Sequence, residues 1–235
     1  MTVRSDRQEL VLLSGMLGDH TAWAEVASDL ADVAHASFPR IDEADTIAAL
    51  AAGVLAEAPE RFALAGHSLG GIVALQVVRD APERVTHLAL VNTSGRDASP
   101  TQLESWAALT DRTLAGEFRA VAGELGRHTL PESRREPDLV ARNIAMAGTV
   151  GASGLLRQLQ SQVTRPDSRP HLGSVDVPTL VVSGALDHVC PPALQEELAA
   201  GMPGARHVVL ETAGHMAPLE APHELAQALR EWLTD

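Results

Sequence analysis

The amino-acid sequence predicts an α/β fold in which helices flank a mainly parallel six-stranded sheet. Short apolar runs alternate with segments of helical period, and most of these runs lack polar alternation. Parallel strands need helical crossovers and are covered on both faces, which produces this pattern. The 235 residues, 45% of them hydrophobic, suffice to bury one large core, so we expect one structural domain overall.

Six apolar runs bounded by Gly, Pro or charged residues are the expected strands. They span residues 10–14, 33–38, 62–66, 85–92, 179–184 and 207–211. Between most of them, apolar residues recur three and four positions apart, which predicts amphipathic helices. This spacing occurs in residues 23–30, 47–54 and 225–232, and Pro222 is well placed to begin the last helix.

Residues 96–169 form the exception, because they contain no strand-like run and several helical stretches punctuated by Gly and Pro. We expect a helical cap inserted into a core made of residues 1–95 and 170–235. The insertion holds 10 arginines against 9 acidic residues, so the strong acidity belongs to the core.

Composition excludes several functional classes. A net charge of −13 makes nucleic acid and anionic membrane surfaces poor partners, and a small neutral substrate fits better. The absence of lysine excludes Schiff-base and Ser-Lys chemistry. The chain has one cysteine, and its N-terminus has no apolar leader, which predicts a cytoplasmic location. No apolar stretch approaches 20 residues, so no membrane span is expected. The oligomeric state is not predicted.

The strongest motif is Gly66-His67-Ser68-Leu69-Gly70, which follows a buried strand and precedes an apolar helix. In a G-x-S-x-G turn the serine backbone is strained and its hydroxyl stands above the sheet. Chance alone produces such a pentapeptide occasionally, but not its strand and helix as well. We therefore interpret Ser68 as a nucleophile, with the Leu69 amide as an oxyanion donor at the helix N-terminus.

A serine nucleophile needs a base, and His215 is the best candidate among ten histidines. It follows the last expected strand, at the strand end where open α/β sheets bind ligands. His67 neighbours the nucleophile on the same turn, so we interpret it as a packing residue. No histidine pair has metal-ligand spacing, so neither a metal nor another cofactor is expected.

The base needs a carboxylate that orients it, and Asp187 lies just beyond the fifth strand. Asp97, beyond the fourth strand, is the rival. Cys190 lies three residues after Asp187, and we assign it no role because a lone cysteine is most often inert filler. The loop after the first strand, Ser14-Gly15-Met16-Leu17-Gly18, supplies the Met16 amide as the second oxyanion donor.

With these four loops in this order, the whole chain resembles the α/β-hydrolase fold family. It looks like compact, capped bacterial hydrolases that include pimeloyl-carrier-protein methyl ester esterases, enol-lactone hydrolases and C–C bond hydrolases. Three features depart from that pattern. Ser14-Gly15 stands where many relatives have His-Gly, and residues 38–45 lack the family's glycine-rich loop. The first expected strand resembles the family's third, so we expect two N-terminal strands of the usual eight to be missing.

The resemblance and the motifs together predict a serine hydrolase that forms an acyl-enzyme on a small or medium apolar carboxylic ester. A lactonase or C–C hydrolase is the alternative among enzymes, and a non-catalytic ligand-binding protein is the alternative outside them. Apolar residues that either line the substrate pocket or form the core of the cap are Leu17, Trp106, Met146, Leu159 and Met216, with Leu109, Phe118 and Leu155. Arg142 or Arg157 is a possible ligand for a substrate carboxylate, although exposure to solvent is the more ordinary role.

Overall fold

A computed structural model describes residues 7–234 of the chain. Residues 1–6, part of the N-terminal segment in which no leader was expected, lie outside the described residues. One sheet contains six strands in the order β2-β1-β3-β4-β5-β6, and all neighbouring pairs are parallel. The predicted fold class is confirmed. The strands are β1 (Gln8–Leu13), β2 (Ala34–Ser37), β3 (Phe62–His67), β4 (Val85–Val91), β5 (Thr179–Gly184) and β6 (Arg206–Leu210).

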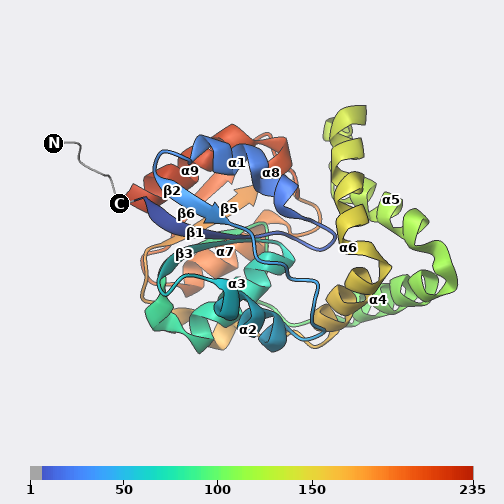
Figure 1. Cartoon of the computed structure of the whole chain (residues 1–235), viewed down its shortest axis with the longest axis horizontal. Helices are drawn as coiled ribbons and strands as arrows, with labels where there is room; N and C mark the ends of the chain where they lie inside the picture. The colour runs from blue at the N-terminus through green and yellow to red at the C-terminus, as the bar shows by residue number, and fades with distance from the viewer. Residues whose placement is uncertain (1–6, 235) are drawn as a thin grey trace.

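Helices cover both faces of the sheet (Figure 1). On one face lie α1 (Ala24–Asp29), α8 (Ala217–Glu220) and α9 (Pro222–Thr234). On the other lie α2 (Ile47–Glu57), α3 (Leu69–Asp80) and α7 (Pro192–Gly201). Successive residues of β3 point to opposite faces, so Ala63 packs in one core and Leu64 in the other. Coverage of both faces explains why the strand sequences show no polar alternation.

The strand order reverses between β1 and β3. The chain runs outward from β1 to β2 and then returns past β1 to β3. In open parallel sheets, ligands bind beyond the carboxyl ends of the strands at such a reversal. The loops after β1 and β3, which carry Met16 and Ser68, therefore flank the expected binding position.

Between β4 and β5 the described chain is helical, and we call α4, α5 and α6 with their connections the helical insertion. It contains α4 (Pro100–Arg112), η3 (Thr113–Glu117), α5 (Phe118–His128), η4 (Glu132–Arg134) and α6 (Pro137–Val163). These helices lie together at one end of the sheet (Figure 1). Their apolar core, which includes Trp106 and Leu155, also contains Leu17 from the loop after β1. The insertion therefore packs against a loop that flanks the expected site.

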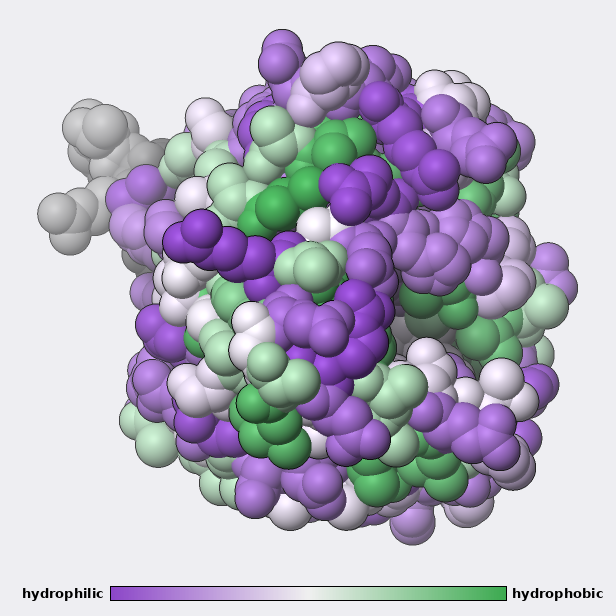
Figure 2. Space-filling view, turned by 90° about the vertical axis from the view of Figure 1, so that its right-hand side faces the viewer, coloured by the Kyte–Doolittle hydropathy of each residue, from purple (hydrophilic) through white to green (hydrophobic). Residues whose placement is uncertain are grey.

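The helix α6 corrects the expectation about apolar stretches. By length and composition alone, its 27 residues would suffice to cross a membrane. The helix is kinked at Gly151, where φ is +69°, and it buries the polar side chains of Asn143 and Gln158. The surface on this side of the molecule is mixed, with hydrophilic residues around several hydrophobic patches (Figure 2). A helix that packs against a protein core passes the same test, so α6 is only weak evidence for a membrane span.

Candidate active site

Ser68 occupies the turn between β3 and α3 with a φ of +52°. The turn requires glycine because a Cβ on Gly66 would collide with the Gly70 carbonyl, and one on Gly70 would collide with the Leu13 carbonyl. The Ser68 amide donates to the Val91 carbonyl at 3.0 Å, and the Ser68 carbonyl accepts from Thr93 Oγ1 at 2.6 Å. These contacts hold the side chain at the carboxyl end of β3 in a strained conformation.

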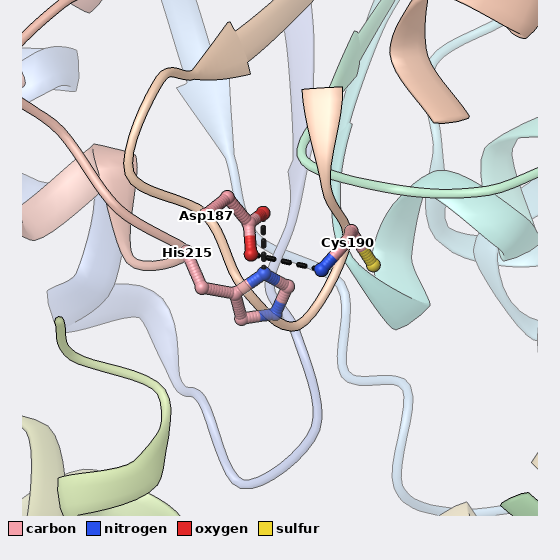
Figure 3. Close-up of side chains that lie close together, drawn as sticks. All are labelled: Asp187, Cys190 and His215. Atoms are coloured by element: carbon pink, nitrogen blue, oxygen red, sulfur yellow. Dashed lines mark hydrogen bonds and ion pairs between the residues drawn. The ribbon is translucent and has the colours of Figure 1, made fainter. Parts of the chain in front are cut away.

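His215 and Asp187 complete a hydrogen-bonded chain with Ser68. His215 Nε2 lies 3.1 Å from Ser68 Oγ, and His215 Nδ1 lies 2.9 Å from Asp187 Oδ2. Figure 3 shows the imidazole and the carboxylate facing each other. Both residues are 3% exposed. Because a carboxylate only accepts, Nδ1 carries the proton, and Nε2 is left free to accept the proton of the serine hydroxyl.

The carboxylate of Asp187 is itself held in place. Its Oδ1 accepts from the amides of Val189 and Cys190, each at 2.8 Å, so both of its oxygens are engaged. The rival candidate, Asp97, makes no contact with His215 and is exposed. The hydrogen bonds thus join His215 to Asp187 and not to Asp97.

Two buried side chains that the sequence analysis did not single out fix the loop that carries His215. Asn92 Nδ2 donates to the carbonyls of Gly214 and His215 at 2.8 and 2.9 Å, and its Oδ1 accepts from the Gly184 amide at 2.7 Å. Glu220 accepts from the amides of Gly214 and Met216, both at 2.8 Å. The only signal for Asn92 was a polar residue at the end of an otherwise apolar strand.

His67 also supports this loop, which goes beyond the packing role expected for it. Its Nε2 donates to the His215 carbonyl at 2.7 Å, and the two imidazole centroids are 5.1 Å apart. Burial, together with the proximity of His215, lowers the pKa of His67 to about 3. His67 is therefore neutral near pH 7 and does not compete as a base.

The two predicted oxyanion donors lie beside Ser68. Gly15 packs so closely that a Cβ there would be 3.1 Å from Ser68 Cβ, and Met16 follows it in the same loop. Within residues 7–234 the amides of Met16 and Leu69 donate to no acceptor, so both are available to a ligand. The next amide, that of Leu17, donates to Gln158 Oε1 of α6 at 3.0 Å, which ties this loop to the insertion.

A cavity of about 690 Å³ opens above Ser68 and His215 and extends under the insertion. Of the predicted pocket residues, Leu17, Trp106 and Met216 line it, as do Leu109 and Met16. The assignment of Met146 and Leu159 to the pocket was wrong: Met146 packs in the core of the sheet and Leu159 in the core of the insertion. Phe118 and Leu155 are also absent from the lining.

The two arginines considered for a substrate carboxylate lie elsewhere. Arg142 pairs with Glu25 at 2.6 Å, and Arg157 Nε donates to the Asp42 carbonyl at 2.7 Å. Neither lines the cavity. The arginines in its wall are Arg96 and Arg165, which sequence reasoning did not distinguish from the other arginines.

Asp187, Cys190 and His215 also have the proximity of a metal-ligand set, because one potential ligand atom of each lies within 4.8 Å of the others (Figure 3). Burial and the nearby charge of Asp187 raise the pKa of the Cys190 thiol well above its ordinary value. A metal ligand must be a thiolate, and Asp187 already uses both of its oxygens. The donor chemistry therefore favours the hydrogen-bonded pair over a metal site.

Comparison with known proteins gives a consistent pattern. The model of a family described as alpha/beta hydrolase fold matches residues 54–222. A pimeloyl-[acyl-carrier protein] methyl ester esterase of Neisseria meningitidis is 30% identical over 216 residues, which cover 90% of this chain and 83% of that protein. A solved esterase from Thermogutta terrifontis, with malate bound, superposes with a TM-score of 0.87 at 28% identity, covering 97% of this chain and 89% of the other. The enol-lactonase of Burkholderia xenovorans has the same TM-score at 24% identity, and the superposition covers 100% of this chain and 94% of the lactonase. This second similarity is one of fold.

Proposed function

Because the chain belongs to the alpha/beta hydrolase fold family, we propose that it is a serine hydrolase that cleaves a small carboxylic ester through an acyl-enzyme on Ser68. The observation that carries the proposal is the unbroken hydrogen-bonded chain from Ser68 through His215 to Asp187. Ser68 and His215 line a cavity, so a substrate can reach the serine hydroxyl. The esterase names of two relatives support the choice of an ester.

The reaction begins when Ser68 Oγ attacks the ester carbonyl while His215 Nε2 takes the hydroxyl proton. Asp187 stabilises the imidazolium through Nδ1. The tetrahedral oxyanion accepts hydrogen bonds from the amides of Met16 and Leu69, and each such donor contributes about 3 kcal/mol of transition-state stabilisation. The imidazolium then protonates the departing alcohol, which leaves the acyl group on Ser68.

The second half repeats the sequence with water as the nucleophile. His215 accepts a proton from water, the hydroxide attacks the acyl-enzyme, and Ser68 leaves with the proton returned by His215. The helical insertion closes the cavity on the side opposite the serine and acts as the cap that limits the size of the acyl group. A cavity of about 690 Å³ accommodates a small-molecule ester.

The test is hydrolysis of short p-nitrophenyl esters and simple lactones by the protein and three variants. We expect Ser68→Ala and His215→Ala to reduce kcat by roughly 10⁴-fold or more, and Asp187→Asn by roughly 10³- to 10⁴-fold. Ser174→Ala changes an exposed serine outside the cavity and should leave kcat unchanged. Full activity of Ser68→Ala would refute the serine mechanism, and cleavage of lactones alone would replace the ester with a lactone.

A further inference from the structure

Arg165 is a buried arginine in the wall of the cavity that contains Ser68. It is 7% exposed and lies just after α6, where the chain leaves the insertion. Its Nη1 donates to Gln162 Oε1 at 2.9 Å, and its Nη2 donates to the Asp97 carbonyl at 3.1 Å and to Gln102 Oε1 at 3.0 Å. Its Cζ lies over the Trp106 ring, 5.3 Å from the ring centroid. All these partners are neutral groups.

Arg165 therefore has no ion-pair partner among residues 7–234, although the charge of Asp97 acts to raise the pKa of the guanidinium against the larger effect of burial. In this described part of the chain, no carboxylate forms an ion pair with it, and two of its five N–H groups, that of Nε and one on Nη1, have no acceptor. Burial lowers the pKa of the guanidinium, but arginine stays protonated in proteins. A buried, unpaired charge is costly to the fold, and that cost is offset when a ligand of opposite charge binds beside it.

The rest of the cavity wall does not neutralise this charge. Arg96 is the other cationic arginine in the lining, and it is already paired with Glu197 at 2.8 Å. Asp97 is the one carboxylate that the described residues contribute to the lining; its side chain is exposed, and its carbonyl rather than its carboxylate is hydrogen-bonded to Arg165. In a chain of net charge −13, the cavity thus holds a positive charge that Asp97 compensates only in part.

We propose that Arg165 binds a carboxylate of the substrate, so that the preferred substrate is an ester that also carries a free carboxylate, such as a half-ester of a dicarboxylic acid. This inference rests on the proposed esterase function. Ser68 and Arg165 line the same cavity, so one molecule can place its ester at the serine and its carboxylate at the guanidinium. The Trp106 ring lies against the guanidinium, whose planar fork of N–H groups matches a carboxylate.

Arg165 also joins the two ends of the insertion, because it contacts Asp97 and Gln102 near the beginning and Gln162 near the end. A structural role alone would make its replacement reduce the hydrolysis of every ester equally. A role in binding a carboxylate would affect only the charged substrate. The test therefore compares two esters that differ in that group.

The experiment measures kcat and KM for monomethyl and dimethyl esters of linear dicarboxylic acids of four to eight carbons. We expect the protein to prefer a monomethyl ester by tenfold or more in kcat/KM. Arg165→Met should raise KM for that ester by tenfold or more, with less than a threefold change for the dimethyl ester. Arg165→Lys, which keeps the charge, should recover part of the preference, and Arg142→Met, which removes the same charge from an exposed position, should retain all of it.

Calorimetric titration with free dicarboxylates gives a readout independent of hydrolysis and of the proposed reaction. We expect binding by the protein and by Ser68→Ala, and its loss in Arg165→Met, whose folding is checked by its melting temperature. If both esters are inert while the dicarboxylates bind, the ester reaction is wrong and the carboxylate site stands. A different outcome is that Arg165→Met cleaves the dimethyl ester at the rate of the unmodified protein and still prefers the monomethyl ester. That result refutes the carboxylate site and leaves the hydrolase in place. Absence of dicarboxylate binding by the unmodified protein also refutes the carboxylate site.

Discussion

Replacement of Asn92 by alanine should destabilise the fold and slow the reaction together. The side chain is completely buried and makes three hydrogen bonds, which join the end of β5 to the loop that carries His215. Asn92 also has a φ of +46°, in the left-handed region that asparagine tolerates better than alanine. Both features are lost in Asn92→Ala.

The magnitude follows from these two terms. Three hydrogen bonds at about 1 kcal/mol each give about 3 kcal/mol. The left-handed conformation adds about 1 kcal/mol for alanine. We therefore expect the free energy of unfolding to fall by about 4 kcal/mol, measured by urea denaturation. We also expect kcat to fall, because the Gly214 carbonyl loses its side-chain donor and the His215 carbonyl keeps only the one from His67.

Asn92→Gly is the matched control. Glycine removes the same hydrogen bonds but adopts the positive φ without strain, so we expect it to cost about 1 kcal/mol less than alanine. A loss below about 1 kcal/mol in Asn92→Ala, with unchanged kcat, would refute the role assigned to this side chain.

Three further outcomes follow from the site. Burial lowers the pKa of His67 to about 3 from the ordinary 6.5, so between about pH 6 and pH 4 only the unfolded chain takes up this proton. This histidine therefore lowers the free energy of unfolding by about 1.4 kcal/mol for each unit by which the pH falls. Urea denaturation of His67→Gln between pH 4 and 7 should show a shallower dependence on pH, and an unchanged dependence would contradict the buried neutral state. Gly70→Ala should prevent folding or abolish activity, because its Cβ would collide with the Leu13 carbonyl. A Cβ on Gly53 meets no atom within 4 Å, so Gly53→Ala should give the circular dichroism spectrum and the rate of ester hydrolysis of the unmodified protein. Gln158→Leu removes the acceptor of the Leu17 amide and should reduce kcat/KM for ester hydrolysis roughly tenfold, which corresponds to about 1.4 kcal/mol; unchanged kcat/KM would contradict the role assigned to this contact between α6 and the loop after β1.

The position of Ser68 at a turn between a strand and a helix could be predicted from the sequence because its setting is local. The strand, the glycine-flanked turn and the helix are consecutive, and the geometry depends on neighbours within a few residues. His215 and Asp187 are distant in sequence from Ser68, and their prediction depended on the order of strands in a parallel sheet. Asn92 could not be predicted because its three contacts join loops that only the fold brings together.

Side chains of the insertion were harder to predict. Helical periodicity identifies the apolar face of a helix but does not distinguish a face that packs in a core from one that lines a cavity, which is why Met146 and Leu159 were assigned wrongly. The arginines pose a similar problem. Arg142 and Arg165 are indistinguishable by type, and only the folded chain shows that Glu25 pairs with Arg142 whereas no carboxylate among residues 7–234 forms an ion pair with Arg165.

Labelling with a fluorophosphonate probe tests the central claim most directly, because the probe forms a covalent bond only with an activated serine. Intact and peptide mass spectrometry should show one adduct per chain, on Ser68. We expect no adduct in Ser68→Ala, greatly slowed labelling in His215→Ala and normal labelling in Ser174→Ala. An adduct on another residue, or equal labelling of Ser68→Ala, would contradict the assignment of Ser68 as the nucleophile.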